Sequence, residues 1–353
     1  MAQELRERHI IRAPGATVAA LRVLLSELET PFVAGQKVGI KLHWGERGNQ
    51  NFLPPALAGE IVRWLQARDI SPFIFDTTVL YSGGRRTGKD SLATAAAHGY
   101  REEELGCPVI IGDGMDGHKV INIAAGFQHF DTVQVASLVP ETDGFVLFSH
   151  FKGHQAMGFG GALKNLSMGF ASRAQKQRMH ADVCPELDPG RCNRCGDCLA
   201  HCPVGAARFA EDGYPIYDRT LCIGCAQCIA MCPRMALKIL WGKELKVFQE
   251  KLVETAAALW RLIGRKTVCI NALIGIASEC DCMTGRHPVI APDYGFIGGT
   301  HPLAVDEESL AVIGAGPFEE AHPDVPWRRQ FDYAEEIRFY PGRGCLEEGG
   351  LSR

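Results

Sequence analysis

The sequence predicts an α/β protein with a mostly parallel sheet covered by helices, interrupted by a small α+β insert rich in cysteine. Apolar stretches of strand length alternate with stretches whose apolar residues recur at helical spacing. Two cysteine runs then occupy residues 192 to 233, and the alternation of strands and helices resumes after them. This resumption favours an insertion into one α/β domain over a second domain fused at the C-terminal end.

The individual elements follow from apolar periodicity and from helix-start signals. Pro54 and Pro55 mark the start of one helix, because proline is tolerated in the first turn. Before the insert we expect helices over 16–28, 54–69 and 92–100, and strands over 36–46, 71–81, 107–114 and 142–150. After the insert we expect helices over 244–263 and 301–316, and a helix followed by a small closing element over 325–342. We also expect a strand over 267–277 and a strand with a loop over 287–299.

Composition narrows the class of protein. The chain has 353 residues, of which 46% are hydrophobic and 22% charged, as in ordinary globular domains. The formal net charge of −4 gives no argument for a nucleic-acid partner. The first ten residues are charged and lack an apolar core, so we expect no signal peptide. No stretch of about 18 apolar residues occurs, so we expect no membrane span and a cytoplasmic location.

The two cysteine runs are the most specific pattern in the chain. Each reads Cys-x2-Cys-x2-Cys-x3-Cys-Pro, and each cysteine of the second run lies 30 residues after its counterpart. This is the spacing of bacterial two-cluster ferredoxins, in which the fourth cysteine of each run ligates the other cluster. We therefore predict two [4Fe–4S] clusters as cofactors. Their ligands would be Cys192, Cys195, Cys198 and Cys232 for one, and Cys222, Cys225, Cys228 and Cys202 for the other.

Zinc knuckles and disulfides are the alternatives to clusters. A four-coordinate zinc site uses two Cys-x2-Cys pairs, which leaves the third cysteine step of each run unexplained. Disulfides fit poorly, because a double cubane motif implies a reducing compartment. Gly213 and Pro215 mark a short hairpin between the runs. We accordingly divide the chain into α/β residues 1–183, a ferredoxin-type insert over 184–241, and α/β residues 242–353.

A second site is expected where the strands end. The predicted strands before the insert are followed by polar residues, and ligands of open α/β sheets bind beyond the carboxyl ends of the strands. The segment that follows Lys152 is rich in glycine, which lets the backbone approach a ligand closely. The candidate catalytic residues are His150, Lys152, His154, Lys164, Asn165 and His180. The alternatives are that the histidines only order the loop, and that the glycine-rich segment only packs against the insert.

Cys280 and Cys282 form a separate cysteine pair, in the sequence Glu-Cys-Asp-Cys. In an extended segment their side chains would face the same way. They are candidates for an additional metal site, although two thiolates cannot close a tetrahedral site without a histidine or Cys184. A redox dithiol and a pair of plain buried thiols are the alternatives. We interpret the remaining cysteines as structural: Cys107, Cys269 and Cys345.

Long stretches of the chain resemble the iron–sulfur centre proteins that carry the DUF362 domain. The similarity extends from about residue 37 to 315 and rests on KLHWGERGN, DTTVLYSGGR, IGDGMDG, SHFKGHQAMGFGGALKNLSMG, RMH, both cysteine runs, INALIGIASECDC and APDYGFIGGTHPLAVD. The resemblance implies an α/β domain interrupted by a two-cluster ferredoxin module, and it brings no established reaction. The late motif departs from the family pattern, because His301 stands where aspartate is usual. A weaker similarity links the Gly-Gly-x-x-Lys-Asn stretch to the nickel-pincer lactate racemases.

Three functions remain open at this point. In the first, an anaerobic oxidoreductase relays electrons between the clusters, a redox partner protein and a small-molecule substrate bound at the α/β loops. In the second, the α/β domain is a docking platform of an electron-transfer adaptor without chemistry of its own. In the third, the protein is a metal-cluster carrier or assembly factor. We expect neither nucleic acid nor a membrane among the partners.

Overall fold

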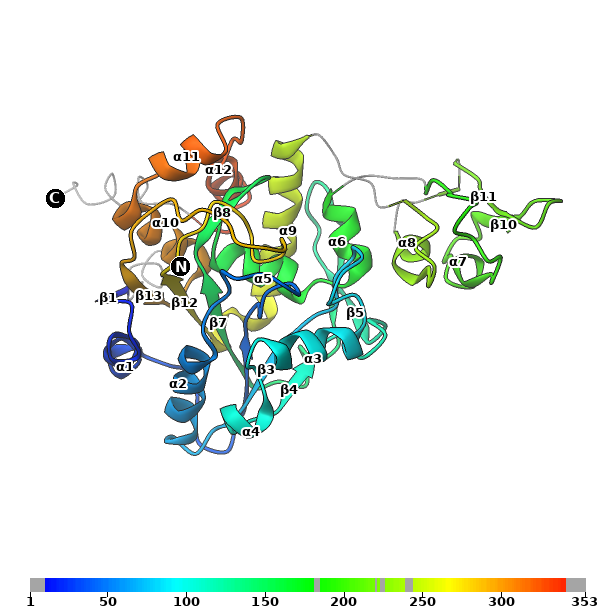
Figure 1. Cartoon of the computed structure of the whole chain (residues 1–353). Coiled ribbons are helices and arrows are strands. Elements are labelled where there is room, and N and C mark those ends of the chain that lie inside the picture. The colour runs from blue at the N-terminus through cyan, green and yellow to red at the C-terminus, as the bar shows by residue number, and fades with distance from the viewer. Residues whose placement is uncertain (1–9, 181–184, 220, 223–225, 239–243, 341–353) are drawn as a thin grey trace.

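A seven-stranded sheet forms the centre of the computed structural model, which describes residues 10–180, 185–219, 221–222, 226–238 and 244–340 (Figure 1). The strand order is β1-β13-β12-β7-β2-β3-β4. The strands are β1 (Ile11–Pro14), β2 (Lys37–Lys41), β3 (Ser71–Asp76), β4 (Val109–Ile111), β7 (Gly144–His150), β12 (Thr267–Leu273) and β13 (Gly295–Gly299). The neighbours from β12 to β4 are parallel, while β13 runs antiparallel to β12 and β1. The predicted mostly parallel sheet is therefore confirmed.

Helices cover both faces of this sheet, as predicted, because side chains of successive strand residues point to opposite faces. Ile74 joins one core, while its neighbours Phe73 and Phe75 join the other. The core of Ile74 contains apolar residues of α1 (Val18–Glu27) and α2 (Pro55–Gln66). Near it lie α3 (Gly88–Ala97) and α4 (Glu102–Leu105). The other core contains residues of α5 (Ala162–Phe170), α9 (Leu245–Ile263), α10 (Pro302–Ile313), α11 (Gly316–Ala321) and α12 (Arg329–Glu336).

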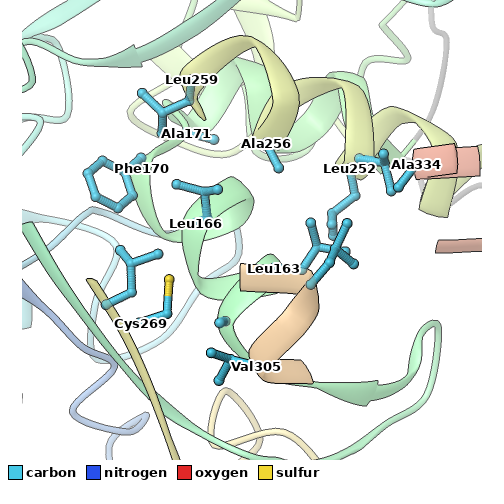
Figure 2. Close-up of a cluster of buried hydrophobic side chains, with 14 of the residues drawn as sticks. Leu163, Leu166, Phe170, Ala171, Leu252, Ala256, Leu259, Cys269, Val305 and Ala334 are labelled. Carbon is cyan, nitrogen blue, oxygen red and sulfur yellow. The ribbon is translucent and has the colours of Figure 1, made fainter. Parts of the chain in front are cut away.

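Helix α5 lies at the centre of the second core. Figure 2 shows its residues Leu163, Leu166 and Phe170 packed among side chains of α9 and the sheet. Leu252 and other α9 residues cover α5 from the side away from the sheet. The segment after Lys152 was expected only as a glycine-rich loop, yet it contains α5 and α6 (Arg173–His180). Burial between the sheet and α9 stabilises a helix whose short glycine-containing sequence gives a weak local signal.

Other elements lie outside the predicted pattern. The strand expected over 287–299 is reduced to β13, because Pro288 and Pro292 lack the amide hydrogen that a strand ladder uses. Two small hairpins were not predicted. They are β5 (Val120–Ala124) with β6 (Thr132–Ala136), and β8 (Lys152–His154) with β9 (Gly158–Gly160).

The cysteine-rich segment packs as a small unit beside α6 (Figure 1). Its elements are α7 (Asp197–Ala200), β10 (Ala207–Phe209), β11 (Pro215–Tyr217) and α8 (Gln227–Met231), and β10 pairs with β11 in the expected hairpin. The two ends of the unit meet, because Leu187 forms an antiparallel bridge with Leu237. The predicted boundaries at 183/184 and 241/242 lie outside the described residues.

No helix in the described part of the chain is long and apolar enough to cross a lipid bilayer.

Candidate functional site

The carboxyl ends of the parallel strands bring buried charges together. β2 ends at Lys41 and β3 ends at Asp76, and the Lys41 Nζ atom lies 2.9 Å from an Asp76 carboxylate oxygen. The other oxygen of Asp76 lies 3.0 Å from Arg85 Nη1. Lys41 also donates to the Asn165 side-chain oxygen, at 2.9 Å, which fixes the first turns of α5 against the sheet edge. Lys41 and Arg85 were not among the predicted site residues, although Lys41 was visible as a cation ending an apolar strand.

Asp281 is a buried acid in the loop after β12, and it lies beside His150 at the end of β7. It is fully buried and pairs with Lys152 Nζ at 2.6 Å and with His150 Nδ1 at 3.0 Å. Burial alone would raise the pKa of Asp281, but the charges of Lys152 and His150 lower it to about 2. The His150 Nε2 atom lies 2.7 Å from the Ile274 carbonyl oxygen. Both ring nitrogens of His150 therefore face oxygen acceptors.

Cys280 and Cys282 lie on either side of Asp281, in a segment that turns and is not an extended strand. Lys164 on α5 donates to the Cys280 sulfur at 3.1 Å, and the Cys282 backbone N–H lies 3.4 Å from the same sulfur. The hydrogen bond from the Cys282 side chain and the charges of Lys164 and Lys152 hold the pKa of Cys280 well below its usual value, against the effect of burial. The same hydrogen bond and burial raise the pKa of Cys282. Cys280 is thus the more readily ionised thiol of the pair, and Cys282 is the weaker acid.

His154 and His180 are close enough to Lys164 for its charge to act on both. The pKa of each is lowered, by burial first and by the Lys164 charge second, to about 3 for His180. His154 Nδ1 accepts the Ala156 backbone N–H at 3.1 Å, and the His180 ring stacks on Phe248 at 4.6 Å between centroids. Both rings are therefore neutral hydrogen-bonding groups near neutral pH.

The predicted catalytic candidates therefore occupy one region of the sheet edge. His150 and Lys152 contact Asp281, Lys164 contacts Cys280, and Asn165 bonds to Lys41 and to Ser149 Oγ at 3.0 Å. His154 and His180 lie around Lys164. Their catalytic role stays a prediction.

The loop after β3 joins this region to the cysteine-rich unit. Tyr81 accepts from Arg85 Nη2 at 2.7 Å, and its hydroxyl lies 3.4 Å from the Cys282 carbonyl oxygen. Its neighbour Leu80 points the other way, into an apolar cluster with Cys198 and Cys232. Arg86 donates to the Leu80 carbonyl and, at 3.2 Å, to the Cys232 carbonyl. Residues 80–86 therefore contact both predicted sites, which sequence reasoning did not foresee.

In the cysteine-rich unit, one cavity is lined by all four cysteines of the first predicted ligand set. These are Cys192, Cys195, Cys198 and Cys232. Backbone N–H groups point at two of the sulfurs of this set, from Ala236 to Cys232 at 3.2 Å and from Arg194 to Cys192 at 3.4 Å. Amide hydrogen bonds to sulfur are among the features that tune iron–sulfur clusters. The donor set and the cavity fit a [4Fe–4S] group.

The second predicted set is only partly described, because Cys225 lies outside the described residues. Its crossing member, Cys202, accepts the Ala206 backbone N–H at 3.2 Å. Burial opposes ionisation of Cys202, but hydrogen bonds from backbone amides, including that of Ala207, lower its pKa below the usual value. Such an environment favours the thiolate that a metal cluster needs.

No group of three or more His, Cys, Asp or Glu side chains in the described ranges is placed to hold a single metal ion. A cubane differs from a single ion, because each of its four irons takes one thiolate and the thiolates stand farther apart. The additional metal site considered for Cys280 and Cys282 gains no third ligand of these types among the described residues. Cys184, its expected partner, lies outside them.

Comparison with known proteins assigns the chain to a family. Two solved structures are similar at 12% identity each: a protein from Thermotoga maritima (TM-score 0.46, 85% of this chain, 60% of that one) and the lactate racemase apoprotein from Thermoanaerobacterium thermosaccharolyticum (TM-score 0.38, 77% of this chain, 52% of that one). The chain thus spans between half and two thirds of each. No curated protein matches it. The model of the DUF362 family, described as a domain of unknown function, matches residues 38–311, and the chain therefore belongs to this family.

Proposed function

We propose that this protein is an iron–sulfur redox protein, in which two [4Fe–4S] clusters in the cysteine-rich unit relay electrons to or from the sheet-edge site. The first cluster would be held by Cys192, Cys195, Cys198 and Cys232, and the second by Cys202, Cys222, Cys225 and Cys228. Bound there, the clusters would supply single electrons at a potential set by burial and hydrogen bonds. The unit between residues 186 and 238 would be a two-cluster ferredoxin-type module inserted into the α/β domain.

One observation carries this proposal: cysteines up to 40 residues apart in sequence line one cavity in the crossed combination of the two-cluster motif. The fourth member, Cys232, comes from the second run, whereas the other three come from the first. Two independent zinc knuckles would instead group the cysteines of each run separately. The antiparallel bridge between Leu187 and Leu237 supports an insertion, because it brings both ends of the unit together.

The position of the unit supports electron transfer to the α/β domain. Leu80, in the β3–α3 loop, belongs to the same apolar cluster as Cys198 and Cys232, two predicted ligands of the first cluster, and Arg86 of the same loop donates to the Cys232 carbonyl. The residue after Leu80, Tyr81, reaches the Cys282 carbonyl. A carrier without chemistry of its own would not need such a connection. We therefore propose an oxidoreductase, with a redox partner protein outside and a small-molecule substrate at the sheet edge.

Anaerobic purification with iron, sulfide and zinc analysis tests the proposal. We expect about eight iron atoms and eight sulfides per chain, and reduced-state EPR signals of [4Fe–4S] clusters. Joint replacement Cys198→Ala and Cys232→Ala should remove about four of the irons. The matched control Cys107→Ala, also a buried cysteine but in the sheet core, should keep all of them. Zinc in place of iron, or iron content unchanged by the double substitution, would contradict the proposal.

A further inference from the structure

We propose that Cys280 and Cys282 are a redox-active dithiol that interconverts with a Cys280–Cys282 disulfide at the sheet edge. The inference deepens the proposed function, on which its electron source rests. The pair differs from plain buried thiols because each sulfur has a defined partner. Lys164 Nζ lies 3.1 Å from the Cys280 sulfur, and the Cys282 backbone N–H and side chain also donate toward that sulfur.

Charge around Cys280 favours a thiolate there. The carboxylate of Asp281, between the two cysteines, is already shared by Lys152 and His150. Among the described residues no carboxylate forms an ion pair with Lys164, so the Cys280 sulfur is the anion that its ammonium contacts. A cation buried without a counter-charge is costly. The thiolate therefore stabilises Lys164, and Lys164 stabilises the reduced form of the pair.

The two cysteines differ in their exposure to solvent. Cys280 is buried, whereas Cys282 is partly exposed. An incoming low-molecular-weight disulfide would therefore meet Cys282 first. Cys282 can pass its proton to Cys280 along their hydrogen bond, which makes Cys282 the attacking thiolate.

A low-molecular-weight disulfide would oxidise the pair by thiol–disulfide exchange. The Cys282 sulfur attacks one sulfur of the oxidant, the oxidant's S–S bond breaks, and a mixed disulfide and one thiolate form. Cys280 returns its proton to the released thiolate and attacks Cys282, which releases the second thiolate. The net products are the Cys280–Cys282 disulfide, one thiol and one thiolate. Two electrons and one proton then restore the Cys280 thiolate and the Cys282 thiol. Under the proposed function, clusters held by the cysteine-rich unit would be the source of these electrons.

The loop over residues 80–86 is the connection to the predicted clusters. Leu80 belongs to the apolar cluster that contains Cys198 and Cys232, and the Tyr81 hydroxyl lies 3.4 Å from the Cys282 carbonyl oxygen. Arg85 holds the Tyr81 hydroxyl at 2.7 Å, while Arg86 bonds to the Cys232 carbonyl at 3.2 Å. Adjacent residues of one loop thus touch a predicted cluster ligand and the dithiol. Electron transfer from a one-electron donor to a dithiol acceptor would require such a short path through covalent bonds and packed atoms.

Anaerobic equilibration of the purified protein in dithiothreitol buffers of graded oxidation, followed by alkylation and peptide mass spectrometry, tests the dithiol without any activity assay. We expect the peptide carrying Cys280 and Cys282 to lose both alkylation sites in one two-electron transition. Replacing either cysteine by serine should abolish the transition. A peptide that stays fully alkylated at every ratio of reduced to oxidised dithiothreitol would overturn the proposal.

The role of Lys164 is tested in the same titration. Lys164→Met should favour the disulfide, by about tenfold in the exchange equilibrium for each pKa unit of thiolate stabilisation that is lost. The exposed control Lys89→Met should leave the equilibrium unchanged. An unchanged equilibrium in Lys164→Met would mean that the thiolate is not the counter-charge of Lys164, which contradicts the argument.

A third measurement separates this inference from the proposed function. In cluster-loaded protein with the pair oxidised, photoreduction by two electrons per chain should generate both thiols, and Cys282→Ser should prevent this. If the protein binds no iron, the proposed function fails while the dithiothreitol titration still decides the dithiol. If iron is present and the pair forms no disulfide, the dithiol fails while the proposed function stands.

Discussion

Asp281 is a fully buried carboxylate at the sheet edge that pairs with two other side chains. Lys152 and His150 both contact it, and its backbone carbonyl accepts the Glu46 N–H at 2.8 Å. Breaking a buried ion pair by removing one partner leaves an uncompensated charge and commonly costs about 3–5 kcal/mol. Asp281 therefore contributes to stability as well as to the position of the cysteines on either side of it.

Asp281→Asn should accordingly lower the free energy of unfolding by about 3–5 kcal/mol, because Lys152 and His150 lose their counter-charge. Anaerobic urea denaturation followed by circular dichroism measures the change. The exposed control Asp324→Asn should alter stability by less than about 0.5 kcal/mol. Equal stability of the two variants would show that the ion pairs at Asp281 contribute nothing net.

Asp306 makes stability depend on pH. This buried carboxylate accepts the Ala162 and Leu163 backbone N–H groups at 2.7 and 2.9 Å and the Asn271 amide, yet burial raises its pKa to about 6. A folded-state pKa above the unfolded value means that the proton binds the folded state more tightly. The resulting stabilisation is complete below the unfolded pKa, near 4, and is lost as pH rises through about 6.

The stability of the wild-type protein should therefore fall relative to Asp306→Asn as pH rises from 5 to 7.5. The shift from 3.8 to about 6 corresponds to about 3 kcal/mol in total, of which about 1.4 kcal/mol is lost between pH 5 and 7.5. Paired thermal unfolding of the two proteins at each pH measures it, and comparing them cancels any acid sensitivity of the cysteine-rich unit. A difference that is constant with pH would refute a raised pKa.

At the scale of elements, the loop after β12 can approach β8 only because Gly153 has no side chain. A Cβ atom at Gly153 would lie 2.1 Å from the Ser278 carbonyl oxygen, and the Gly153 N–H donates to the Ala277 carbonyl at 2.8 Å. Lys152 stands beside this contact and Asp281 follows it in the loop. The close approach of the two backbones therefore sets the distance between the Lys152 ammonium and the Asp281 carboxylate.

Gly153→Ala should push the loop away from β8 and destabilise the protein by about 1–3 kcal/mol, as overpacking does. Because the loop carries Cys280, we also expect faster alkylation of that buried thiol. Thermal unfolding and the alkylation rate measure the two effects. The control Gly316→Ala has open space around its new methyl group and should show neither. A loop that stayed in place would leave the Cys280 rate unchanged.

At the scale of the whole molecule, the cysteine-rich unit and the sheet depend on each other unequally. The unit closes on itself through the Leu187–Leu237 bridge and through hydrogen bonds from Lys238 N to Glu186 O and from Asp188 N to Ala236 O. The sheet has its own cores on both faces, which contain none of the described residues between 186 and 238. Removing the unit would cost the α/β domain the burial of Leu80 and the contacts of Arg86, together with the hydrogen bond from Gln227 Nε2 to Gln134 Oε1 at 3.0 Å and the ring contact of His118 with His201.

Replacing residues 186–238 by a short Gly-Ser linker should therefore leave a folded α/β protein. We expect a cooperative thermal transition and a circular dichroism spectrum of mixed helix and strand. The additional substitution Leu80→Ser should improve solubility, since it removes an apolar side chain that the deletion exposes. An unfolded product would show that the unit is needed for the sheet to form.

Much of the fold could be predicted from local patterns. The apolar periodicity of 54–69 and 244–263 indicated α2 and α9, and the buried runs indicated the parallel strands. The strand β1, the helix α5 and the antiparallel direction of β13 could not be predicted. Their short sequences become regular through pairing and burial against distant segments, and a local window contains no such partner.

The sequence by itself determined two features of this protein. One is the cysteine spacing that predicts two crossed ligand sets, and the other is the series of polar residues that follow the strands. Only the tertiary structure brought Lys164 to Cys280, 116 residues away, and Tyr81 to Cys282, 201 residues away. The physical reason is that parallel strands align their carboxyl ends at one edge, whatever their distance in sequence. Contacts across that edge depend on sheet order and on close backbone approach, neither of which any single stretch of residues encodes.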